Sequence, residues 1–236
     1  MKRLLLLLAL TPLLHAQEVE ITAEPHHHFT FENKSVRVFN VEVPPNDATL
    51  LHWHRHDYIA VTLGTAEISN TVKDKPPVTV KFTDGDTRFS PATFAHIVRT
   101  TSPQAFRNVT VELLEDATLR TSTAKWDASK NDDRSLDILH GGTIQILFVK
   151  DAVRASEVEL QPGAVIPEHH HAGPHLLIAV TDLDLKSEDL RRGEKGKAPE
   201  SVHLKSGDSK WVEAGATHTV TNTAKTPAKY VTLEFP

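Results

Sequence analysis

The sequence has no cysteine. A disulfide, a thiolate metal ligand and a cysteine nucleophile are therefore excluded, and any metal ion must be bound through nitrogen and oxygen atoms. Aromatic residues are scarce, at 6%, and long apolar runs are almost lacking. The run from Leu4 to Leu14 falls well short of the roughly 20 residues that a helix needs to span a bilayer. We therefore expect no stable membrane anchor.

The first residues have the layout of a secretory signal peptide. Lys2 and Arg3 precede the apolar run and the small residue Ala16 follows it, which predicts a signal peptide over residues 1–16 and a secreted or periplasmic protein. The formal net charge is −5 with neutral histidines, from 26 basic and 31 acidic residues. Loss of the leader makes the charge more negative, so we expect no nucleic-acid partner.

Beyond the leader, the same pattern occurs twice. SVRVFNVEVPPNDATLLHWH (35–54) matches AVRASEVELQPGAVIPEHHH (152–171), IAVT (59–62) recurs at 178–181, DGDTRFSPATFAH (84–96) matches SGDSKWVEAGATH (206–218), and VTVEL (109–113) matches VTLEF (231–235). Because each copy has the length of a small domain, the repeat predicts two domains. We expect them at residues 17–115 and 147–236, joined by a polar linker or arm at 116–146.

Each copy consists of short runs rich in Val, Thr, Ile and Phe, often alternating between polar and apolar residues. Pro-Pro, Asp-Gly and Gly-Asp separate these runs, which is typical of strands and turns. The chain past the leader has no long helical pattern. We therefore predict an all-β protein of two small antiparallel barrels or sandwiches in tandem.

The C-terminal copy resembles the two sequence motifs of the cupin family, G-x5-H-x-H-x3or4-E-x6-G and G-x5-P-x-G-x2-H-x3-N. The first motif corresponds to Gly163, His169, His171, His175 in place of glutamate, and Asp182 in place of the last glycine; the second corresponds to Gly207, Glu213 in place of proline, Gly215, His218 and Asn222. The resemblance implies two tandem cupin-type antiparallel barrels (double-stranded β-helix or jelly roll). It also implies a metal site formed by His169, His171, His175 and His218.

The N-terminal copy resembles the same motifs with more departures. In its second motif Gly85, Pro91 and His96 keep their spacing, while Thr93 and Thr100 replace glycine and asparagine. His52 and His54 form its H-x-H pair, and with His96 they are the expected metal ligands. The repeat sets His56 against His175, whereas counting back from the closing glycine selects Asp57. His56 and Asp57 remain alternatives for the fourth ligand.

Strand geometry supports this assignment independently of the family. Alternate side chains of a strand share a face, so His169 and His171 point to one side and His170 to the other.

Imidazole suits borderline transition metals, and four neutral imidazoles leave a divalent ion its full charge, so we expect Fe, Ni, Cu or Zn in preference to Mn. The alternative to a metal site is that His169, His171, His175 and His218 are polar loop histidines that bind no metal. The triplet from His26 to His28 has no partner motif and is interpreted as a solvated arm.

Several functions follow from the resemblance, because cupins include dioxygenases, oxalate-converting enzymes, isomerases, lyases and binding proteins. Two-domain oxalate decarboxylases resemble this layout, but they rely on manganese and a glutamate ligand. Neither copy in this sequence has that glutamate. The leading hypothesis is a secreted metal-binding bicupin, an oxidoreductase of the dioxygenase type acting on a small organic molecule. The alternatives are a non-catalytic module with a closed structural metal site and a redox-silent lyase or isomerase. Such barrels often pair, which implies a homodimer.

Overall fold

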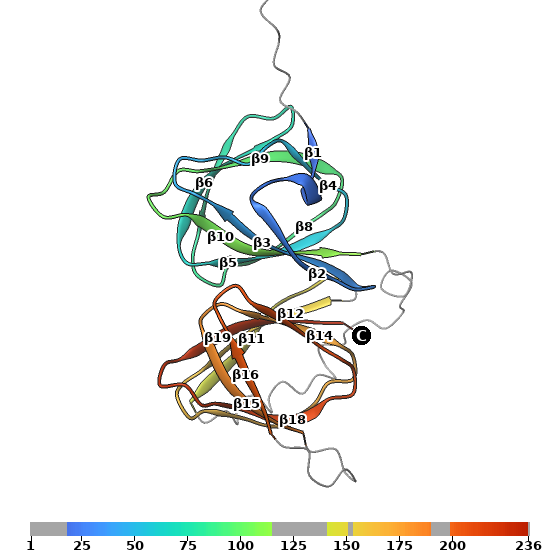
Figure 1. Cartoon of the computed structure of the whole chain (residues 1–236), viewed down its shortest axis with the longest axis vertical. Helices are drawn as coiled ribbons and strands as arrows, with labels where there is room; N and C mark the ends of the chain where they lie inside the picture. Colours follow the sequence, from blue (N-terminus) through green and yellow to red (C-terminus); the bar gives the residue numbers. More distant parts are fainter. Residues whose placement is uncertain (1–17, 115–140, 151–152, 190–198, 236) are drawn as a thin grey trace, which may run out of the picture.

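The computed structural model describes residues 18–114, 141–150, 153–189 and 199–235. The expected signal peptide and residues 116–140 of the expected linker lie outside these ranges. The described chain is built from strands in four sheets, two for each half (Figure 1), which confirms the predicted all-β class. No helix in the described ranges is long and apolar enough to cross a membrane.

The N-terminal half contains ten strands and one short 3-10 helix within the described ranges. The helix is η1 (Ile21–Ala23), and the strands are β1 (Val19–Glu20), β2 (His27–Glu32), β3 (Val36–Val43), β4 (His52–His54), β5 (Tyr58–Leu63), β6 (Ala66–Val72), β7 (Val78–Phe82), β8 (Thr87–Ser90), β9 (Phe94–Thr100) and β10 (Phe106–Leu113). They form two sheets, with the orders β1-β4-β9-β6-β7 and β2-β3-β10-β5-β8.

The C-terminal half repeats this arrangement. Its strands are β11 (Gly142–Lys150), β12 (Val153–Leu160), β13 (Val165–His170), β14 (His175–Ala179), β15 (Leu183–Asp189), β16 (Glu200–Leu204), β17 (Ser209–Val212), β18 (Thr217–Asn222) and β19 (Ala228–Glu234). The sheet orders are β11-β12-β19-β14-β17 and β13-β18-β15-β16, so each strand except β1 has a counterpart. β11 begins within the segment expected as a linker.

The two faces of the sheet around β10 have different surroundings. Val109 and Val111 are fully buried in a core cluster that also contains Val231 and Leu233 of β19, so they pack between the two halves. Thr110, between the two valines, lines a cavity enclosed by the N-terminal sheets. The strand alternation therefore places apolar residues against the other half and leaves polar residues facing the cavity.

The two halves approach closely at glycines of the second motif. At Gly207 (φ +98) an added Cβ would lie 3.2 Å from Cδ1 of Leu63, and at Gly85 (φ +87) it would lie 2.6 Å from Oε2 of Glu157 and from Cε of Lys229. The ammonium of Lys229 also pairs with Glu157 at 3.0 Å. These glycines therefore combine a left-handed turn with a close contact between the halves.

Candidate metal centres

Three histidines of the N-terminal half meet on the sheet that contains β4 and β9. His52 and His54 lie two residues apart on β4, and His96 on β9 is the cross-strand partner of His52. All three are buried, and the ring of Trp53, which stands between the first two, contacts exposed Arg55 instead. The structure thus brings together these three expected ligands, with the side-chain alternation that the H-x-H spacing predicts.

The Nε2 atoms of these histidines converge. Nε2 of His96 lies 3.1 Å from Nε2 of His52 and 3.1 Å from Nε2 of His54. Nδ1 of His52 donates to the carbonyl of Leu50 at 2.9 Å, and Nδ1 of His96 donates to Oδ1 of Asn70 at 2.8 Å. With the protons on Nδ1, the Nε2 lone pairs of His52 and His96 face each other, which a cation between them would relieve. The cluster therefore fits a metal ion bound through Nε2.

Burial favours the neutral form of these imidazoles, which is the form that binds metal. It lowers the pKa of His52 to about 4, with a further contribution from the nearby His27. Burial, followed by the neighbouring histidines, also holds the pKa values of His54 and His96 far below the usual range. The cluster is therefore uncharged at neutral pH before any metal binds.

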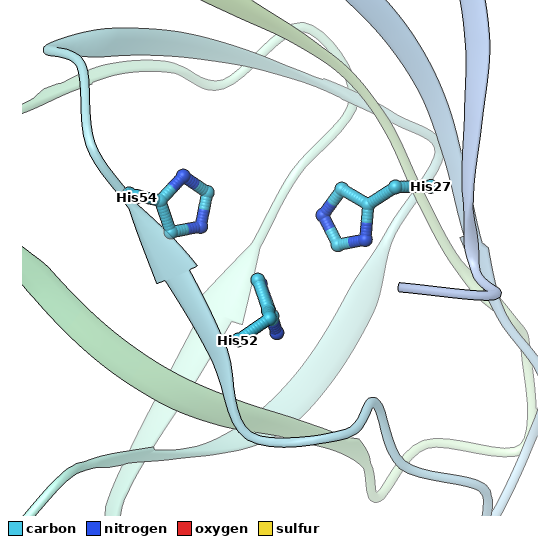
Figure 2. Close-up of side chains that lie close together, drawn as sticks. All are labelled: His27, His52 and His54. Carbon is cyan, nitrogen blue, oxygen red and sulfur yellow. The ribbon is translucent and has the colours of Figure 1, made fainter. Parts of the chain in front are cut away.

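A fourth histidine, His27, joins the cluster from β2 (Figure 2). Its side chain is only 5% exposed, and its ring centroid lies 4.7 Å from that of His52 and 6.3 Å from that of His54. Ligand atoms of these three histidines lie within 4.8 Å of one another. The interpretation of residues 26–28 as a solvated arm is therefore wrong for His27. No motif marked it, because it precedes the repeated segment.

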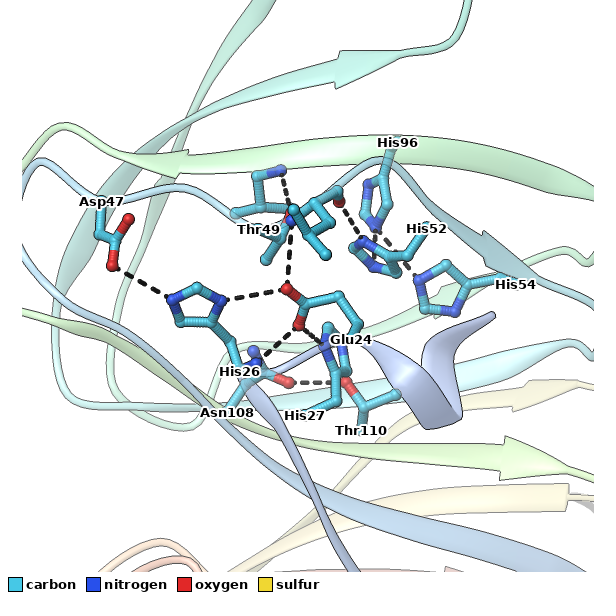
Figure 3. Close-up of polar contacts among 12 residues, drawn as sticks. Glu24, His26, His27, Asp47, Thr49, His52, His54, His96, Asn108 and Thr110 are labelled. Atoms are coloured by element: carbon cyan, nitrogen blue, oxygen red, sulfur yellow. Dashed lines mark hydrogen bonds and ion pairs between the residues drawn. The ribbon is translucent and has the colours of Figure 1, made fainter. Parts of the chain in front are cut away.

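The buried carboxylate of Glu24 organises this end of the cluster (Figure 3). It accepts hydrogen bonds from Nδ1 of His27 at 2.6 Å, Nδ1 of His26 at 3.0 Å and the backbone N–H of Leu50 at 3.1 Å. Its side chain is 0% exposed. Burial alone would raise the pKa of Glu24, but the bonds from His27 and His26 outweigh it and lower the pKa to about 2.

Tyr58 occupies the fourth motif position of the N-terminal half. It pairs with Glu112 across β5 and β10, as His175 pairs with Glu234 across β14 and β19. The strand register therefore makes Tyr58 the counterpart of His175. This corrects the alignment predicted from the sequence repeat, which set His56 against His175.

Neither alternative for a fourth N-terminal ligand is among the residues that line the cavity beside the cluster. Oδ1 of Asp57 accepts a hydrogen bond from the backbone N–H of Ala92 at 2.7 Å. The ring contacts of the described residues link His27, His52 and His54 with one another but do not include His56. The structure thus brings neither predicted alternative to the converging Nε2 atoms.

The C-terminal half contains a second cluster on the sheet of β13 and β18. His169 and His218 are cross-strand partners, and with His171 they place ligand atoms within 4.8 Å of one another. Their ring centroids lie 4.5 Å apart for His169 and His218 and 4.8 Å apart for His169 and His171. His170 is exposed, its Nδ1 lies 2.9 Å from Oγ1 of Thr217, and it is not part of the group of converging ligand atoms, although it also lines the cavity.

Acceptors behind the C-terminal histidines hold their rings in place. Nδ1 of His169 donates to the carbonyl of Pro167 at 2.8 Å, and Nδ1 of His171 donates to Oε1 of Glu234 at 2.9 Å. Nε of Arg154 donates to the other oxygen of Glu234 at 2.6 Å. Such bonds at Nδ1 direct Nε2 toward a metal, so this cluster also fits a metal ion.

His175, the fourth expected C-terminal ligand, lies across from β13 on strand β14. Its ring stacks on that of His171 with centroids 4.1 Å apart at 29°, as Tyr58 stacks on His54 at 4.2 Å and 22°. Burial, followed by the nearby His171, lowers the pKa of His175 to about 3. The structure therefore places His175 beside the triad of His169, His171 and His218 as a neutral, stacked imidazole.

The two centres differ in what stands opposite the histidines. His27 pairs with Val41, the sixth residue of β3, and Ile144 pairs with Val158, the sixth residue of β12. Ile144 therefore takes the C-terminal place that corresponds to His27.

The two cavities also differ in size. The cavity beside the N-terminal cluster has a volume of ≈ 180 Å³, against ≈ 420 Å³ beside the C-terminal cluster.

Comparison with known proteins shows similarity of fold. No family model matches the sequence, and no curated protein sequence matches it. Oxalate decarboxylase structures match 89% of this chain and 75% of their own length, one at 15% identity with a TM-score of 0.58 and another, the Bacillus subtilis enzyme with Mn(II) centres, at 13% with 0.59. A cupin 2 conserved barrel domain protein from Leptotrichia buccalis matches 89% of this chain and 88% of its own at 12% identity, with a TM-score of 0.51.

These similarities identify the architecture. The chain has an all-β fold of two cupin domains, each made of paired sheets, arranged as in oxalate decarboxylase. Each domain contains a histidine triad that is a candidate metal site. At these identities the match concerns the fold, and function must be argued from the sites themselves.

Proposed function

We propose that this bicupin is an exported, metal-dependent oxidoreductase of the dioxygenase type that acts on a small, largely apolar organic molecule at its C-terminal centre. The observation that supports this proposal is the cavity of ≈ 420 Å³ lined by His169, His171 and His218. Ligand-binding cavities of roughly this size hold small organic molecules. The N-terminal cavity has less than half that volume.

The lining of the C-terminal cavity favours an apolar substrate body. Aliphatic side chains cover much of its wall, among them Ile144, Ile146, Ile166, Leu177, Val212 and Val220. They would bind a ring or alkyl chain by burying its surface, and they would keep water from the reacting atoms. The substrate would then present its oxygen atoms to the histidine end of the cavity.

The charged residues of the lining argue against a small dianion. Arg154 is hydrogen-bonded to Glu234, and Nζ of Lys210 pairs with Glu200 at 2.5 Å. Each of these two cations already has a carboxylate partner, so a substrate such as oxalate would have to displace one. A neutral enol, catechol or β-diketone meets no such cost.

The chain's own residues would hold a metal ion through His169, His171 and His218, with the stacked His175 within reach of the same cavity. The ion would supply Lewis acidity and redox chemistry toward O₂. Glu234 keeps the proton of His171 on Nδ1 and thereby keeps Nε2 as the ligand atom. An all-imidazole set supports Fe, Ni, Cu or Zn in preference to Mn.

Metal analysis and oxygen uptake test this proposal. The protein is purified without chelator, its metal content is measured, and O₂ consumption is followed with flavonols, catechols, β-diketones and oxalate. We expect a redox-active metal, O₂ uptake with at least one of the first three classes, and loss of uptake in His169→Ala. The His203→Ala variant is the matched control, because His203 is exposed and pairs with Asp184.

Three outcomes would overturn the dioxygenase assignment in different ways. Stoichiometric zinc without turnover would identify a non-catalytic binding module. Turnover of a substrate without O₂ consumption would identify a lyase or isomerase. Oxalate as the preferred substrate, with manganese bound, would place the activity with the structurally similar decarboxylases.

A non-catalytic role is the second candidate for the N-terminal centre, because its histidines are buried and its cavity is small. A closed shell of four imidazoles leaves a tetrahedral ion no open position, which is typical of structural sites. Removing this centre with His52→Ala should lower thermal stability while O₂ uptake per folded molecule is retained. Loss of uptake without loss of stability would assign catalysis to the N-terminal centre.

Export and assembly form two further parts of the proposal. Export is supported by the basic and apolar leader of residues 1–16 and is tested by N-terminal sequencing of protein from the periplasm or medium. A chain that keeps Met1 and stays in the cytoplasm would contradict it. A homodimer is tested by light scattering on the purified protein, where the mass of one chain would contradict it.

A further inference from the structure

The N-terminal centre has one histidine more than its motif accounts for. His52, His54 and His96 fill the motif positions, and Tyr58 stands where the fourth ligand would be. His27, from outside the repeat, faces the same space (Figure 2). The two cupin domains therefore do not carry two copies of one site.

We propose that the N-terminal centre binds its metal through His27 as the fourth ligand, supplied by β2 instead of the motif strand, and that Glu24 is the residue that positions it. This rests on the part of the proposed function that makes the centre a metal site. It adds the ligand set, and with it a structural role for β2, the strand that carries His27.

The orientation of the His27 ring supports this assignment. Its Nδ1 donates to Oε2 of Glu24 at 2.6 Å, which leaves the lone pair on Nε2, the atom turned toward the other histidines. His52 and His96 are held in the same way by acceptors at Nδ1. Three rings from three different strands thus have their outer nitrogens occupied and their inner nitrogens available, which is the arrangement found around metal-bound histidines.

Glu24 links two of the ligands through one buried carboxylate. Its Oε1 accepts the backbone N–H of Leu50 at 3.1 Å, and the carbonyl of Leu50 accepts Nδ1 of His52 at 2.9 Å. The same carboxylate holds His27. A change at Glu24 therefore disturbs the ring of His27 directly and that of His52 through one residue of backbone (Figure 3).

Tyr58 is a poor candidate for the fourth ligand on geometric grounds. Its ring lies face to face with the imidazole of His54, at a centroid distance of 4.2 Å and an angle of 22°. Tyr58 pairs with Ser90 on the neighbouring strand β8, and its hydroxyl lies within reach of the Ser90 side chain. Tyr58 therefore packs against a ligand and does not compete with His27 for the metal.

The consequence is that the metal would link β2, near the N-terminal end of the described residues, to the opposite sheet. His27 is the first residue of β2, three residues after Glu24, and β2 is one of the two edge strands of its sheet. A metal bound by β2 together with β4 and β9 would tie this edge to the opposite sheet. Metal binding should then protect the segment from residue 18 to residue 32 against proteolysis.

The test uses the full chain with His169→Ala and His171→Ala, which removes two C-terminal ligands and leaves the N-terminal centre as the measured site. Co²⁺ is titrated, and its visible spectrum and hyperfine-shifted exchangeable N–H protons are recorded. We expect one Co²⁺ per chain and exchangeable signals that include His27. Adding His27→Ala should remove one such signal and weaken Co²⁺ binding.

The variants Glu24→Gln, His28→Ala and Tyr58→Phe complete the design. Glu24→Gln should shift or abolish the His27 signal and raise the Kd for Co²⁺ about 10- to 100-fold. His28→Ala, the exposed neighbour on the same strand, and Tyr58→Phe should keep both the affinity and the spectrum. Circular dichroism of the metal-free variants shows whether each is folded, and a misfolded His27→Ala leaves Glu24→Gln as the deciding variant.

An unchanged spectrum and affinity in both His27→Ala and Glu24→Gln would overturn the proposal, as would loss of Co²⁺ in Tyr58→Phe alone. A parent background that binds no Co²⁺ would overturn it as well. The C-terminal oxidoreductase proposal is separable, because O₂ uptake is measured in a chain with His52→Ala and His54→Ala. Either result can fail while the other holds.

Discussion

Oε1 of Glu234 accepts a hydrogen bond from Nδ1 of His171 at 2.9 Å, whereas their N-terminal counterparts, Glu112 and His54, do not form this bond. Among the described residues, Oε1 of Glu112 and Nδ1 of His54 are both buried and have no hydrogen-bond partner. The carboxylate that supports a metal-facing histidine in one domain thus bonds Arg37, and not the histidine, in the other. In the N-terminal domain Glu24 takes over this role for a different histidine.

This difference predicts that Glu234→Gln weakens metal binding at the C-terminal centre about 10- to 100-fold. An amide keeps an acceptor oxygen but loses the charge that holds the imidazole proton on Nδ1, and it also replaces the carboxylate that Arg154 contacts. The measurement is the Kd for Zn²⁺ or Co²⁺ by competition with a chromophoric chelator. The chain should carry His52→Ala so that the C-terminal centre dominates the reading.

The matched control for Glu234→Gln is Glu112→Gln at the equivalent position. Because Oε1 of Glu112 has no partner among the described residues, this change should leave metal affinity at both centres within about twofold. Equal effects of the two substitutions would contradict the idea that the bond to His171, and not general burial of a charge, supports the metal site.

Metal-free protein should lose stability as the pH falls below about 6.5. Burial and then the nearby His27 lower the pKa of His52 to about 4 in the folded chain, while the unfolded chain keeps a value of about 6.5. The unfolded state therefore takes up the proton first, and acid favours unfolding from about pH 6.5 down to about pH 4. His52 alone accounts for a loss on the order of 3 kcal/mol.

Urea unfolding of chelator-treated protein at several pH values measures this effect. The histidine partners of Glu24 lower its pKa to about 2 against the opposing effect of burial. Glu24 therefore affects stability only below about pH 4.5, and the pH dependence above that value comes from the histidines. His52→Gln should flatten the dependence, and His203→Ala should not. A urea midpoint that stays constant from pH 7 to pH 5 would contradict the buried, neutral state of the cluster.

The sequence allows the domain architecture and most of the site to be predicted, because two local rules are strong. The H-x-H spacing places His52 and His54 on one face of a strand, and the glycine-to-histidine spacing of the second motif adds His96 from a neighbouring strand. The recurring VTVEL (109–113) is typical of a strand, but it does not show which face of that strand is turned to solvent. In the structure neither face is exposed, because the valines of β10 pack on the other domain.

The fourth ligand position is harder to predict, because two signals conflict. An alignment of the copies on the recurring IAVT sets His56 against His175. In the strand pairing it is Tyr58, two residues later, that corresponds to His175. The spacing after the H-x-H pair is the better guide, since Tyr58 follows His54 as His175 follows His171. His27 lies outside both motifs, and only the pairing of β2 with β3 brings it to the cluster.

Thr93 should be a site where a single substitution stabilises the protein. Its φ is +72, a left-handed value that β-branched residues rarely adopt, and its counterpart Gly215 has φ +82. Both backbone N–H groups donate to the second histidine of the H-x-H pair, Thr93 to the carbonyl of His54 at 2.8 Å and Gly215 to that of His171 at 2.9 Å. Thr93 thus adopts a strained conformation that the hydrogen bond requires.

Thr93→Gly removes a strain of roughly 1–2 kcal/mol and adds roughly 0.5–1 kcal/mol of backbone entropy cost. We therefore expect a net gain of about 0.5–1 kcal/mol in the free energy of unfolding, measured with urea. Thr93→Ala keeps the unfavourable φ and should give a smaller gain. If Thr93→Gly destabilises the chain, the threonine side chain contributes more than its conformation costs.

The close contact between the domains can be tested by adding one methyl group at each of two glycines. Gly64 and Gly85 both have left-handed φ values, +77 and +87, but an added Cβ at Gly64 meets nothing within 4 Å, whereas at Gly85 it meets Glu157 and Lys229 at 2.6 Å. Gly64→Ala should cost about 1–2 kcal/mol for its conformation alone. Gly85→Ala should cost more, because the ion pair between Glu157 and Lys229 must move. Urea unfolding gives both values, and the difference between them measures the packing of one domain on the other. Equal costs would mean that the two side chains withdraw freely and that the apolar cluster around Val109 and Val231 holds the domains together without them.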